Sequence, residues 1–443
     1  MLPKIIDLFS GCGGLALGFE KAGFDIAAGI ELMPEAHQTV SYNIDFRHGR
    51  EATHICGDIT ETDAGVFGNC FGDEGCVVIG GPPCQAYSIA GRAKLRSLGE
   101  DRINTNDSRG YLYQDFLRFV YDLDAQAVVM ENVPEAVNFG DMNIPEIVCE
   151  SLEKHGYTAI WTVLNSADYG VPQIRERIFL IGVKKNLNVT VEFPAATHTS
   201  KDDYQTKYTR RFSSFSDYPH FAVPETADTE RKPWVSVDDA ISDLPVLFSD
   251  SNSKYKNMKL SEELDYKCEA SNEYQQLMRT WYDSEPFGIT ANSFRNTRRD
   301  FPIFERMKQG DDYIAASKIA DELFEREASI LGYIPGSEEY LKLKKKMVPV
   351  YDREKFERKW QKLRSDLPSH TLVAHLSKDT YSHIHPIEPR GISVREAARI
   401  QSFPDDFFFS CSMGDAFKQI GNAVPPLLAY RVAECLHKAF SED

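Results

Sequence analysis

The sequence predicts an α/β fold, a doubly wound and mostly parallel sheet with a smaller, irregular second domain inserted into it. Three features predict this arrangement. Short apolar runs alternate with helical stretches up to about residue 190, the alternation is lost from about residue 194, and it returns after about residue 390. Strands that alternate with helices are typical of a parallel sheet covered on both faces. Ligands of such sheets bind at the carboxyl ends of the strands.

The individual elements follow from local patterns. The expected strands are short runs rich in Val and Ile at 4–9, 25–30, 77–79, 127–130 and 178–183. The expected helices lie at 15–22, 34–43, 113–123, 393–403 and 424–440, and prolines begin the last of them. We therefore expect residues 1–193 and 412–443 to form one domain, 194–390 a second domain, and 391–411 a hinge.

Composition narrows the class of protein. The chain has 443 residues, of which 42% are hydrophobic and 26% charged, as in an ordinary globular protein. No apolar run could cross a membrane and no charged leader precedes an apolar segment, so we expect a cytoplasmic protein with no membrane partner. The nine scattered cysteines favour a reducing compartment. The net charge of −17 argues against general nucleic-acid binding, but it describes the average surface and not one cleft.

A glycine-rich turn follows the first expected strand. In "DLFSGCGG", Gly11, Gly13 and Gly14 allow a tight turn and a close approach of the backbone to a ligand. A structural turn explains the glycines equally well. Two acidic residues favour the interpretation of this turn as a ligand-binding turn. Glu31 ends the next strand, where it can hold ribose hydroxyls, and Asp58 follows a further strand. The Gly-Lys-Ser/Thr ending of a phosphate-binding loop is missing, which favours a nucleoside cofactor without a pyrophosphate.

A cysteine stands just beyond another strand. In "CVVIGGPPCQAYS", Pro82 and Pro83 fix two φ angles, so Cys84 is held at a defined place after the strand end. A thiol reacts as its thiolate and needs a polar, positively biased environment to do so. A buried structural cysteine is the alternative, but the flexible basic loop that follows makes this alternative less attractive.

Two further strand ends carry charged side chains. "VVMENVPEA" places Glu131 at the end of an apolar strand, as a helix cap or as an acid in a cleft. "VPQIRERIFLIGV" places Arg175 and Arg177 on one face of a strand. These arginines are either exposed edge charges or groups that orient an anion or a base oxygen.

Taken together, these motifs resemble those of the cytosine-C5 DNA methyltransferases of the bacterial or phage modification type. The matching stretches, in the family's order, are "DLFSGCGG", "GGPPCQAYS", "ENV", "QIRER", "RGISVREAARIQSFPDDF" and "QIGNAVPPLLA". The resemblance implies the Rossmann-like fold of S-adenosylmethionine methyltransferases, with S-adenosyl-L-methionine as cofactor, S-adenosyl-L-homocysteine as product, and double-stranded DNA as partner. It also makes 1–193 with 412–443 the catalytic and cofactor-binding domain, 194–390 the target-recognition domain, and 391–411 a hinge and closing motif.

The resemblance also implies the chemistry. Cys84 would attack C6 of a cytosine flipped out of the duplex, which makes C5 nucleophilic toward the methyl group. Glu131 would hold or protonate N3, Arg175 would steady the O2 side, and Arg177 would support the site. No metal is required.

Other residues take roles by their positions in the motifs. The cofactor pocket would include Phe9, Leu32, Ile59, Pro82, Leu112 and Asn422 besides the glycines, Glu31 and Asp58. Phe9 and Leu112 fit an ordinary core equally well. Contacts to DNA are expected from Gln85, Ser88, Arg92 and Thr371. For Thr371 a plain structural hydroxyl is the simpler alternative.

Two rival functions remain open at this point. One is methylation of cytosine in tRNA, but the Cys-Phe-Thr signature of that branch is missing. The other is a catalytically inactive DNA-binding relative, against which the intact Cys84, Glu131, Arg175 and Arg177 argue. We expect a monomer, with a restriction endonuclease as a possible companion in the same system.

Overall fold

The structure is a computed structural model, and the chain forms two compact units. It describes residues 2–51, 53–83, 112–139, 142–201, 204, 206, 210, 212–224, 230–248, 258–282, 288–352, 359–378 and 381–441. Unit 1 comprises Met1–Trp234, Gln401–Phe403 and Asn422–Asp443, and unit 2 comprises Val235–Ile400 and Pro404–Gly421.

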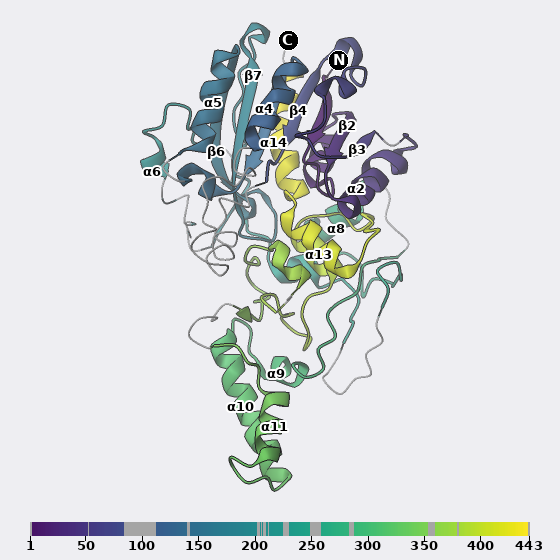
Figure 1. Cartoon of the computed structure of the whole chain (residues 1–443), viewed down its shortest axis with the longest axis vertical. Helices are drawn as coiled ribbons and strands as arrows, with labels where there is room; N and C mark the ends of the chain where they lie inside the picture. Colours follow the sequence, from purple (N-terminus) through teal and green to yellow (C-terminus); the bar gives the residue numbers. More distant parts are fainter. Residues whose placement is uncertain are drawn as a thin grey trace. The chain divides into compact units, whose positions relative to one another are not determined.

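Unit 1 is built on a seven-stranded sheet in the order β3-β2-β1-β4-β5-β7-β6 (Figure 1). The strands are β1 (Lys4–Leu8), β2 (Ile26–Glu31), β3 (His54–Cys56), β4 (Cys76–Gly80), β5 (Ala127–Asn132), β6 (Tyr157–Asn165) and β7 (Glu176–Lys184). The five strands from β3 to β5 are parallel, and β7 runs antiparallel to both β5 and β6. The expected doubly wound, mostly parallel sheet is confirmed.

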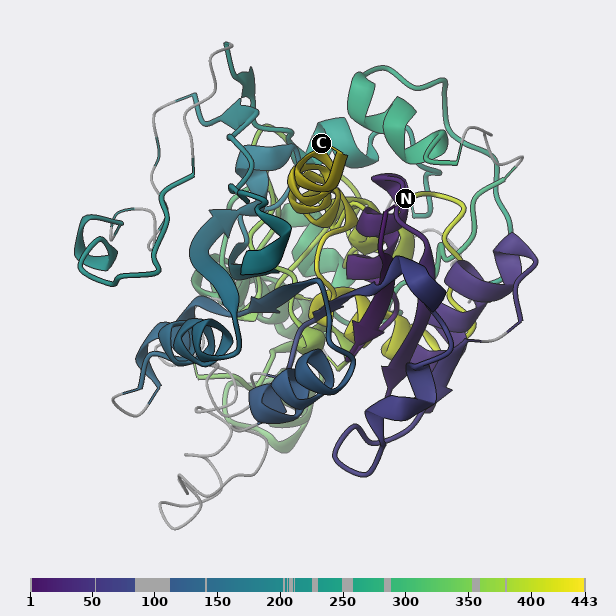
Figure 2. The same ribbon diagram turned by 90° about the horizontal axis from the view of Figure 1, so that it is seen from above.

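Helices cover both faces of this sheet, as Figure 2 shows. They are α1 (Gly14–Lys21), α2 (Pro34–Val40), α4 (Leu112–Asp122), α5 (Ile144–Lys154) and α14 (Pro426–Ser441). Helices α4 and α5 pack on one face, where Phe116 and Val148 join Val78 and Val128 in a buried core. Helices α1 and α14 pack together on the other face. The expected helices are confirmed, although α2 continues into a π-helical segment, η1 (Ser41–Asp45).

Strand β6 was not among the expected strands, and the segment that covers it lies beyond the expected end of the first domain. The backbone N–H of Trp161 donates to the carbonyl of His220, and Ala222 donates back to Trp161, both at 2.9 Å. Phe215, Tyr218 and Phe221 pack against the Trp161 ring. The segment around Phe221 therefore protects this edge strand, and unit 1 continues to Trp234 instead of ending at 193.

The remaining short elements of unit 1 connect these parts. They are η2 (Phe46–His48), η3 (Ala64–Phe67), η4 (Gly72–Glu74), η7 (Pro134–Asn138), η8 (Ser166–Tyr169), η9 (Lys185–Leu187), β8 (His198–Thr199), α6 (Phe212–Phe215) and β9 (Lys232–Pro233). Strands β8 and β9 form a separate parallel pair.

Unit 2 consists of short helices joined by long irregular segments. Its helices are α7 (Val237–Ile241), α8 (Glu273–Arg279), α9 (Phe301–Arg306), α10 (Tyr313–Ile330), α11 (Glu338–Met347), η12 (Ala374–Ser377), α12 (Val394–Ile400) and α13 (Met413–Asn422), whose last residue belongs to unit 1. An aromatic core that includes Phe301, Phe304, Trp360 and Tyr381 holds it together. Helices α10 and α11 form a hairpin (Figure 1). The unit boundaries differ from the expected domain boundaries, and the roles assigned to the domains stay predictions.

No helix within the described ranges is both long and apolar enough to cross a membrane.

Candidate active site

The predicted site residues of unit 1 gather at the carboxyl edge of the sheet. Leu8, the last residue of β1, pairs with Ile30 on one side and with Gly80 on the other, and Gly80 pairs with Met130. Because these strands are parallel and in register, the segments that follow them emerge at one edge. The order of strands reverses between β1 and β4, and this is where a doubly wound sheet binds its ligand.

The turn after β1 is held in an uncommon conformation. Phe9 and Gly11 have φ angles of +57° and +58°, in the left-handed region that side chains disfavour. The backbone N–H of Gly11 donates to Glu31 Oε2 at 2.8 Å, and that of Met33 donates to Glu31 Oε1 at 2.7 Å. The Glu31 carboxylate is thereby fixed at the end of β2. A Cβ atom added to Gly11 would meet no atom within 4 Å, so the turn borders open space at this point.

The other two glycines of the turn motif, Gly13 and Gly14, have packing roles, and so does Gly18 within α1. A Cβ on Gly13 would lie 2.9 Å from Val40 Cγ2. A Cβ on Gly14 would lie 2.5 Å from the carbonyl oxygen of Val424, and one on Gly18 would lie 2.4 Å from Ala429 Cβ. Glycine at positions 14 and 18 lets α1 approach α14 and the residues just before it closely, whereas Gly13 packs against α2. Of the three predicted cofactor glycines, Gly11 alone faces open space.

The segment after β3 is fixed by its own hydrogen bonds and by α4. Asp58 Oδ1 accepts from the backbone N–H and the hydroxyl of Thr60, at 2.9 and 2.8 Å. Arg118 Nη2 donates to the carbonyl of Ile59 at 2.6 Å, and its Nη1 donates to the carbonyl of Thr62 at 3.1 Å. Arg118, which lies on α4, therefore holds the segment that follows Asp58 in place through two of its carbonyl groups. Sequence reasoning missed Arg118 because its partners lie more than fifty residues away in the chain.

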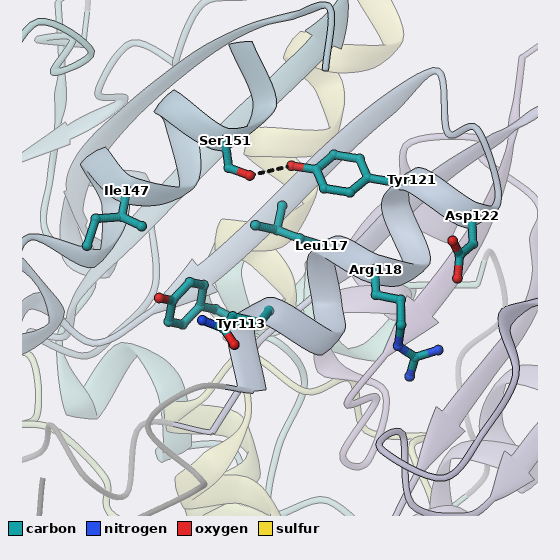
Figure 3. Close-up of a pocket in the computed structure, with 8 residues that line it drawn as sticks. Tyr113, Leu117, Arg118, Tyr121, Asp122, Ile147 and Ser151 are labelled. Carbon is teal, nitrogen blue, oxygen red and sulfur yellow. Dashed lines mark hydrogen bonds between the residues drawn. The ribbon is translucent and has the colours of Figure 1, made fainter. Parts of the chain in front are cut away.

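Arg118 also borders a pocket between α4 and α5 (Figure 3). Figure 3 shows Tyr121 hydrogen-bonded to Ser151 of α5, while Arg118 extends away from that pair; the hydroxyl oxygens are 2.8 Å apart. The pocket lies against the outer side of α4, and its lining contains none of the predicted site residues. We therefore place the candidate site at the carboxyl edge and not in this pocket.

An ion pair between β5 and β7 forms the centre of the candidate site. Arg177 Nε lies 2.9 Å from Glu131 Oε1, and each side chain is 13% exposed. Burial raises the pKa of the Glu131 carboxyl above its ordinary value, although the positive charges of Arg177 and Arg175 oppose the rise. Antiparallel pairing of β5 with β7 brings these residues together, because it sets Glu131 opposite Phe179, two residues from Arg177. A carboxyl with a raised pKa suits a group that donates a proton.

At each of the two glycines before the prolines, a different neighbouring atom leaves no room for a side chain. A Cβ on Gly80 would lie 2.2 Å from the carbonyl oxygen of Leu8 in the neighbouring strand. A Cβ on Gly81 would lie 2.9 Å from Glu131 Oε2. Asn132 Nδ2 then donates to the carbonyl of Pro82 at 3.3 Å. The chain that leads to Cys84 is thus fitted closely around the Glu131 carboxylate.

Arg175 lies deeper than Arg177, with 1% of its surface exposed. Its Nη2 donates to the carbonyl of Ala423 at 3.0 Å, and its backbone N–H donates to Asn165 Oδ1 at 3.3 Å. Its carbonyl accepts from the N–H and the hydroxyl of Ser166, at 2.8 and 2.9 Å. These contacts fix both its backbone and its guanidinium. The structure therefore brings Glu131, Arg175 and Arg177 together.

The other predicted residues are distributed as follows. Cys84, Gln85, Ser88 and Arg92 lie outside the described residues. Ile59 and Pro82 are buried, Leu32 and Asn422 are exposed, and Phe9 and Leu112 are partly buried against the core of the sheet. Thr371 belongs to unit 2, where it is partly buried shortly before η12. The functional roles of all these residues stay predictions.

Unit 2 holds a separate buried cluster of ionisable groups. Ligand atoms of His385, Glu388 and Glu396 lie within 4.8 Å of one another. Arg390 donates to both carboxylates, with N–O distances of 2.7 to 3.0 Å. Burial lowers the pKa of His385 to about 4, so this histidine is neutral near pH 7. Arg390 is the counter-ion of the two glutamates, and the cluster is a structural support.

Comparisons with a protein family and with individual proteins all point to methyltransferases. The family described as C-5 cytosine-specific DNA methylase matches residues 3–438. A putative type II methyltransferase of Oceanobacillus iheyensis, M.OihORF3336P, is 52% identical over 99% of this chain and 96% of its own length. The type II methyltransferase M.AgeI of Thalassovita gelatinovora is 31% identical over 99% of this chain and 100% of its own length.

Solved structures agree on the fold. The crystal structure of a putative DNA modification methyltransferase encoded within an E. coli prophage aligns with a TM-score of 0.65 at 23% identity, covering 100% of both chains. A methyltransferase of Entamoeba histolytica, EhMeth, aligns with a TM-score of 0.50 at 13% identity, again over 100% of both chains.

Proposed function

This chain belongs to the C-5 cytosine-specific DNA methylase family, and from that premise we propose that it methylates C5 of a cytosine flipped out of a specific duplex sequence, through a covalent bond between Cys84 and C6. The observation that carries the proposal is the Glu131–Arg177 pair, with Arg175 beside it, next to the turn that leads to Cys84. The family and the relatives favour DNA over tRNA as the substrate.

The turn after β1 and the end of β2 fit S-adenosyl-L-methionine. Open space borders Gly11, the Glu31 carboxylate is fixed beside it, and the exposed side chain of Leu32 offers an apolar surface next to that carboxylate. The Glu31 carboxylate accepts hydrogen bonds from the backbone N–H groups of Gly11 and Met33, and an acidic side chain at this strand end suits the ribose hydroxyls of a nucleoside cofactor. When bound, S-adenosyl-L-methionine would supply the methyl group and would leave as S-adenosyl-L-homocysteine.

Cys84 would act as the nucleophile. Its thiolate adds to C6 of the cytosine, and the electron pair of the C5–C6 bond becomes available at C5 for the new carbon–carbon bond. Loss of the C5 proton then restores the double bond and expels the thiolate. Asn132 holds the carbonyl of Pro82, two residues before Cys84 in the chain.

Glu131 would control the charge of the ring during this reaction. Attack at C6 builds negative charge that reaches N3, and a proton donated by a carboxyl group at N3 neutralises that charge. The raised pKa of Glu131 favours the protonated form that such a donor needs. Arg175 would steady O2, and Arg177 would hold Glu131 in the required orientation.

The DNA side of the proposal rests on the resemblance. Gln85, Ser88 and Arg92 would contact the flipped nucleotide or its phosphates, and Thr371 would contact DNA from the target-recognition domain. We also propose that the protein acts as a monomer and that a restriction endonuclease of the same system shares its recognition sequence.

Base-resolution mapping of 5-methylcytosine in plasmid DNA tests the function. Cells that make the protein should carry one fully modified short sequence, and cells that make Cys84→Ser should lack it. An unmodified plasmid with well-folded protein would contradict the proposal and would favour an inactive DNA-binding relative or an RNA substrate.

A further inference from the structure

The turn between α13 and α14 contains a carbonyl group, that of Ala423, that accepts hydrogen bonds from two buried side chains. The Ala423 carbonyl accepts from Arg175 Nη2 at 3.0 Å and from Gln401 Nε2 at 2.6 Å. The next residue, Val424, packs its own carbonyl against Gly14, at the start of the helix that follows the cofactor turn. The residue before it, Asn422, is one of the predicted cofactor contacts. This turn therefore joins the predicted base site to the predicted cofactor site.

Gln401 is the side chain that holds this turn. It is fully buried, and while its Nε2 donates to Ala423, its Oε1 accepts from Gln173 Nε2 at 2.5 Å. Gln173 is also fully buried and lies two residues before Arg175. Gln401 thus supports Arg175 in two ways. It bonds to Gln173, two residues before Arg175, and it bonds to the Ala423 carbonyl that the Arg175 guanidinium contacts.

The chemistry at this position requires a side-chain amide. One end must donate to a carbonyl and the other end must accept from an amide, and a glutamine does both in a fixed geometry. The Ala423 carbonyl has two lone pairs, and Arg175 and Gln401 occupy both of them. Without the Gln401 bond, the Ala423 carbonyl would keep its bond from Arg175, but Gln401 would no longer hold this carbonyl in place for the Arg175 guanidinium.

We propose that Gln401 is a positioning residue for methyl transfer, which holds Arg175 at the cytosine and the Asn422–Ala423 turn at the cofactor. The inference rests on the proposed function. Gln401 does not contact the substrate in this scheme, so its loss should slow formation of the bond to C6 while cofactor binding through Gly11 and Glu31 largely remains. A displacement of an ångström at a reacting centre lowers a rate by as much as about 100-fold.

The test compares Gln401→Met, which keeps the length of the side chain but removes both hydrogen bonds, with two further variants. Gln173→Met removes the bond between the two glutamines and leaves the bond to Ala423. Gln126→Met is the matched control, because Gln126 Nε2 donates to the carbonyl of Glu74 at the opposite edge of the sheet, at 3.2 Å. Two quantities are measured: the rate of covalent adduct formation with a duplex containing 5-fluorocytosine, and the affinity for S-adenosyl-L-homocysteine by calorimetry.

Adduct formation should slow on the order of 10- to 100-fold in Gln401→Met, by a smaller factor in Gln173→Met, and less than about twofold in Gln126→Met. Affinity for S-adenosyl-L-homocysteine should fall by less than about fivefold in Gln401→Met, a split that general damage to the fold would not produce. A rate in Gln401→Met within twofold of wild type would overturn the proposal, as would an equal loss in Gln126→Met or an equal loss of adduct formation and affinity. Failure of the proposed function looks different, because the wild-type protein itself would then form no adduct.

Discussion

Replacement of Gly81 by alanine should impair catalysis without destabilising the protein. The added Cβ would lie 2.9 Å from Glu131 Oε2, whereas ordinary contact begins at 3.4 Å. The carboxylate must therefore retreat by about half an ångström from a position that Arg177 fixes at 2.9 Å. If a displacement of one ångström lowers the rate about 100-fold, half of that displacement predicts a loss of about 10-fold.

The Gly81→Ala substitution should not lower the stability of the protein, although it lowers the rate. Gly81 has no positive φ angle, so alanine fits its backbone without strain. Alanine also lowers the conformational entropy of the unfolded chain, which stabilises a protein by about 0.4–1 kcal/mol where the site tolerates it. We therefore expect an unchanged or slightly higher melting temperature together with the loss of rate.

The assay is single-turnover methyl transfer from radiolabelled S-adenosyl-L-methionine, with thermal unfolding measured on the same samples. Gly68→Ala is the control, because its Cβ would approach a backbone carbonyl oxygen, that of Gly65, at 3.3 Å, away from the site. A Gly81→Ala variant with wild-type rate would refute the claim that the Glu131 carboxylate must stay where the structure places it. Equal losses in both variants would show that the effect is not specific to the site.

Three further predictions concern the nucleophile, the acid and the edge of the sheet. Cys84→Ser should bind S-adenosyl-L-methionine like wild type and lose almost all methyl transfer, since a hydroxyl is a much weaker nucleophile; near-normal turnover would exclude the covalent mechanism. Glu131→Gln should lower the rate about 10²- to 10⁴-fold, the range for general acid catalysis, with circular dichroism unchanged; an unaltered rate would remove Glu131 from the mechanism. Burial lowers the pKa of His220, but its hydrogen bonds to Glu146 and Glu153 outweigh burial and raise it overall. The stabilisation by protonated His220 is complete below the pKa of an unfolded histidine, near ~6.5, and is lost as the pH rises through the raised folded pKa. His220→Gln should therefore cost about 1–2 kcal/mol of unfolding free energy at pH 6 and close to nothing at pH 9.5, and an equal cost at both pH values would count against this ion pair.

Local sequence was enough to predict most strands of the sheet and to propose many candidate residues of the site. The apolar runs that became β1, β4 and β5 are visible because a buried parallel strand needs nearly continuous apolar residues. Glu131 and the two arginines stood out because they are charged residues at the ends of such runs. Strand β6 was missed although its sequence, "YTAIWTVLN", is rich in aromatic and β-branched residues.

Only the tertiary structure could decide which of these residues meet and why neighbouring positions are restricted. Gly81 is restricted by the carboxylate of Glu131, fifty residues away, and Gly14 is restricted by the carbonyl of Val424, just before α14 and more than four hundred residues away. The Gln173–Gln401 bond likewise joins residues that are 228 positions apart. Patterns of hydrophobicity and glycine reflect the conformation of a short stretch of backbone. Steric limits and hydrogen bonds between distant segments depend on the packing of the whole unit, which periodicity does not encode.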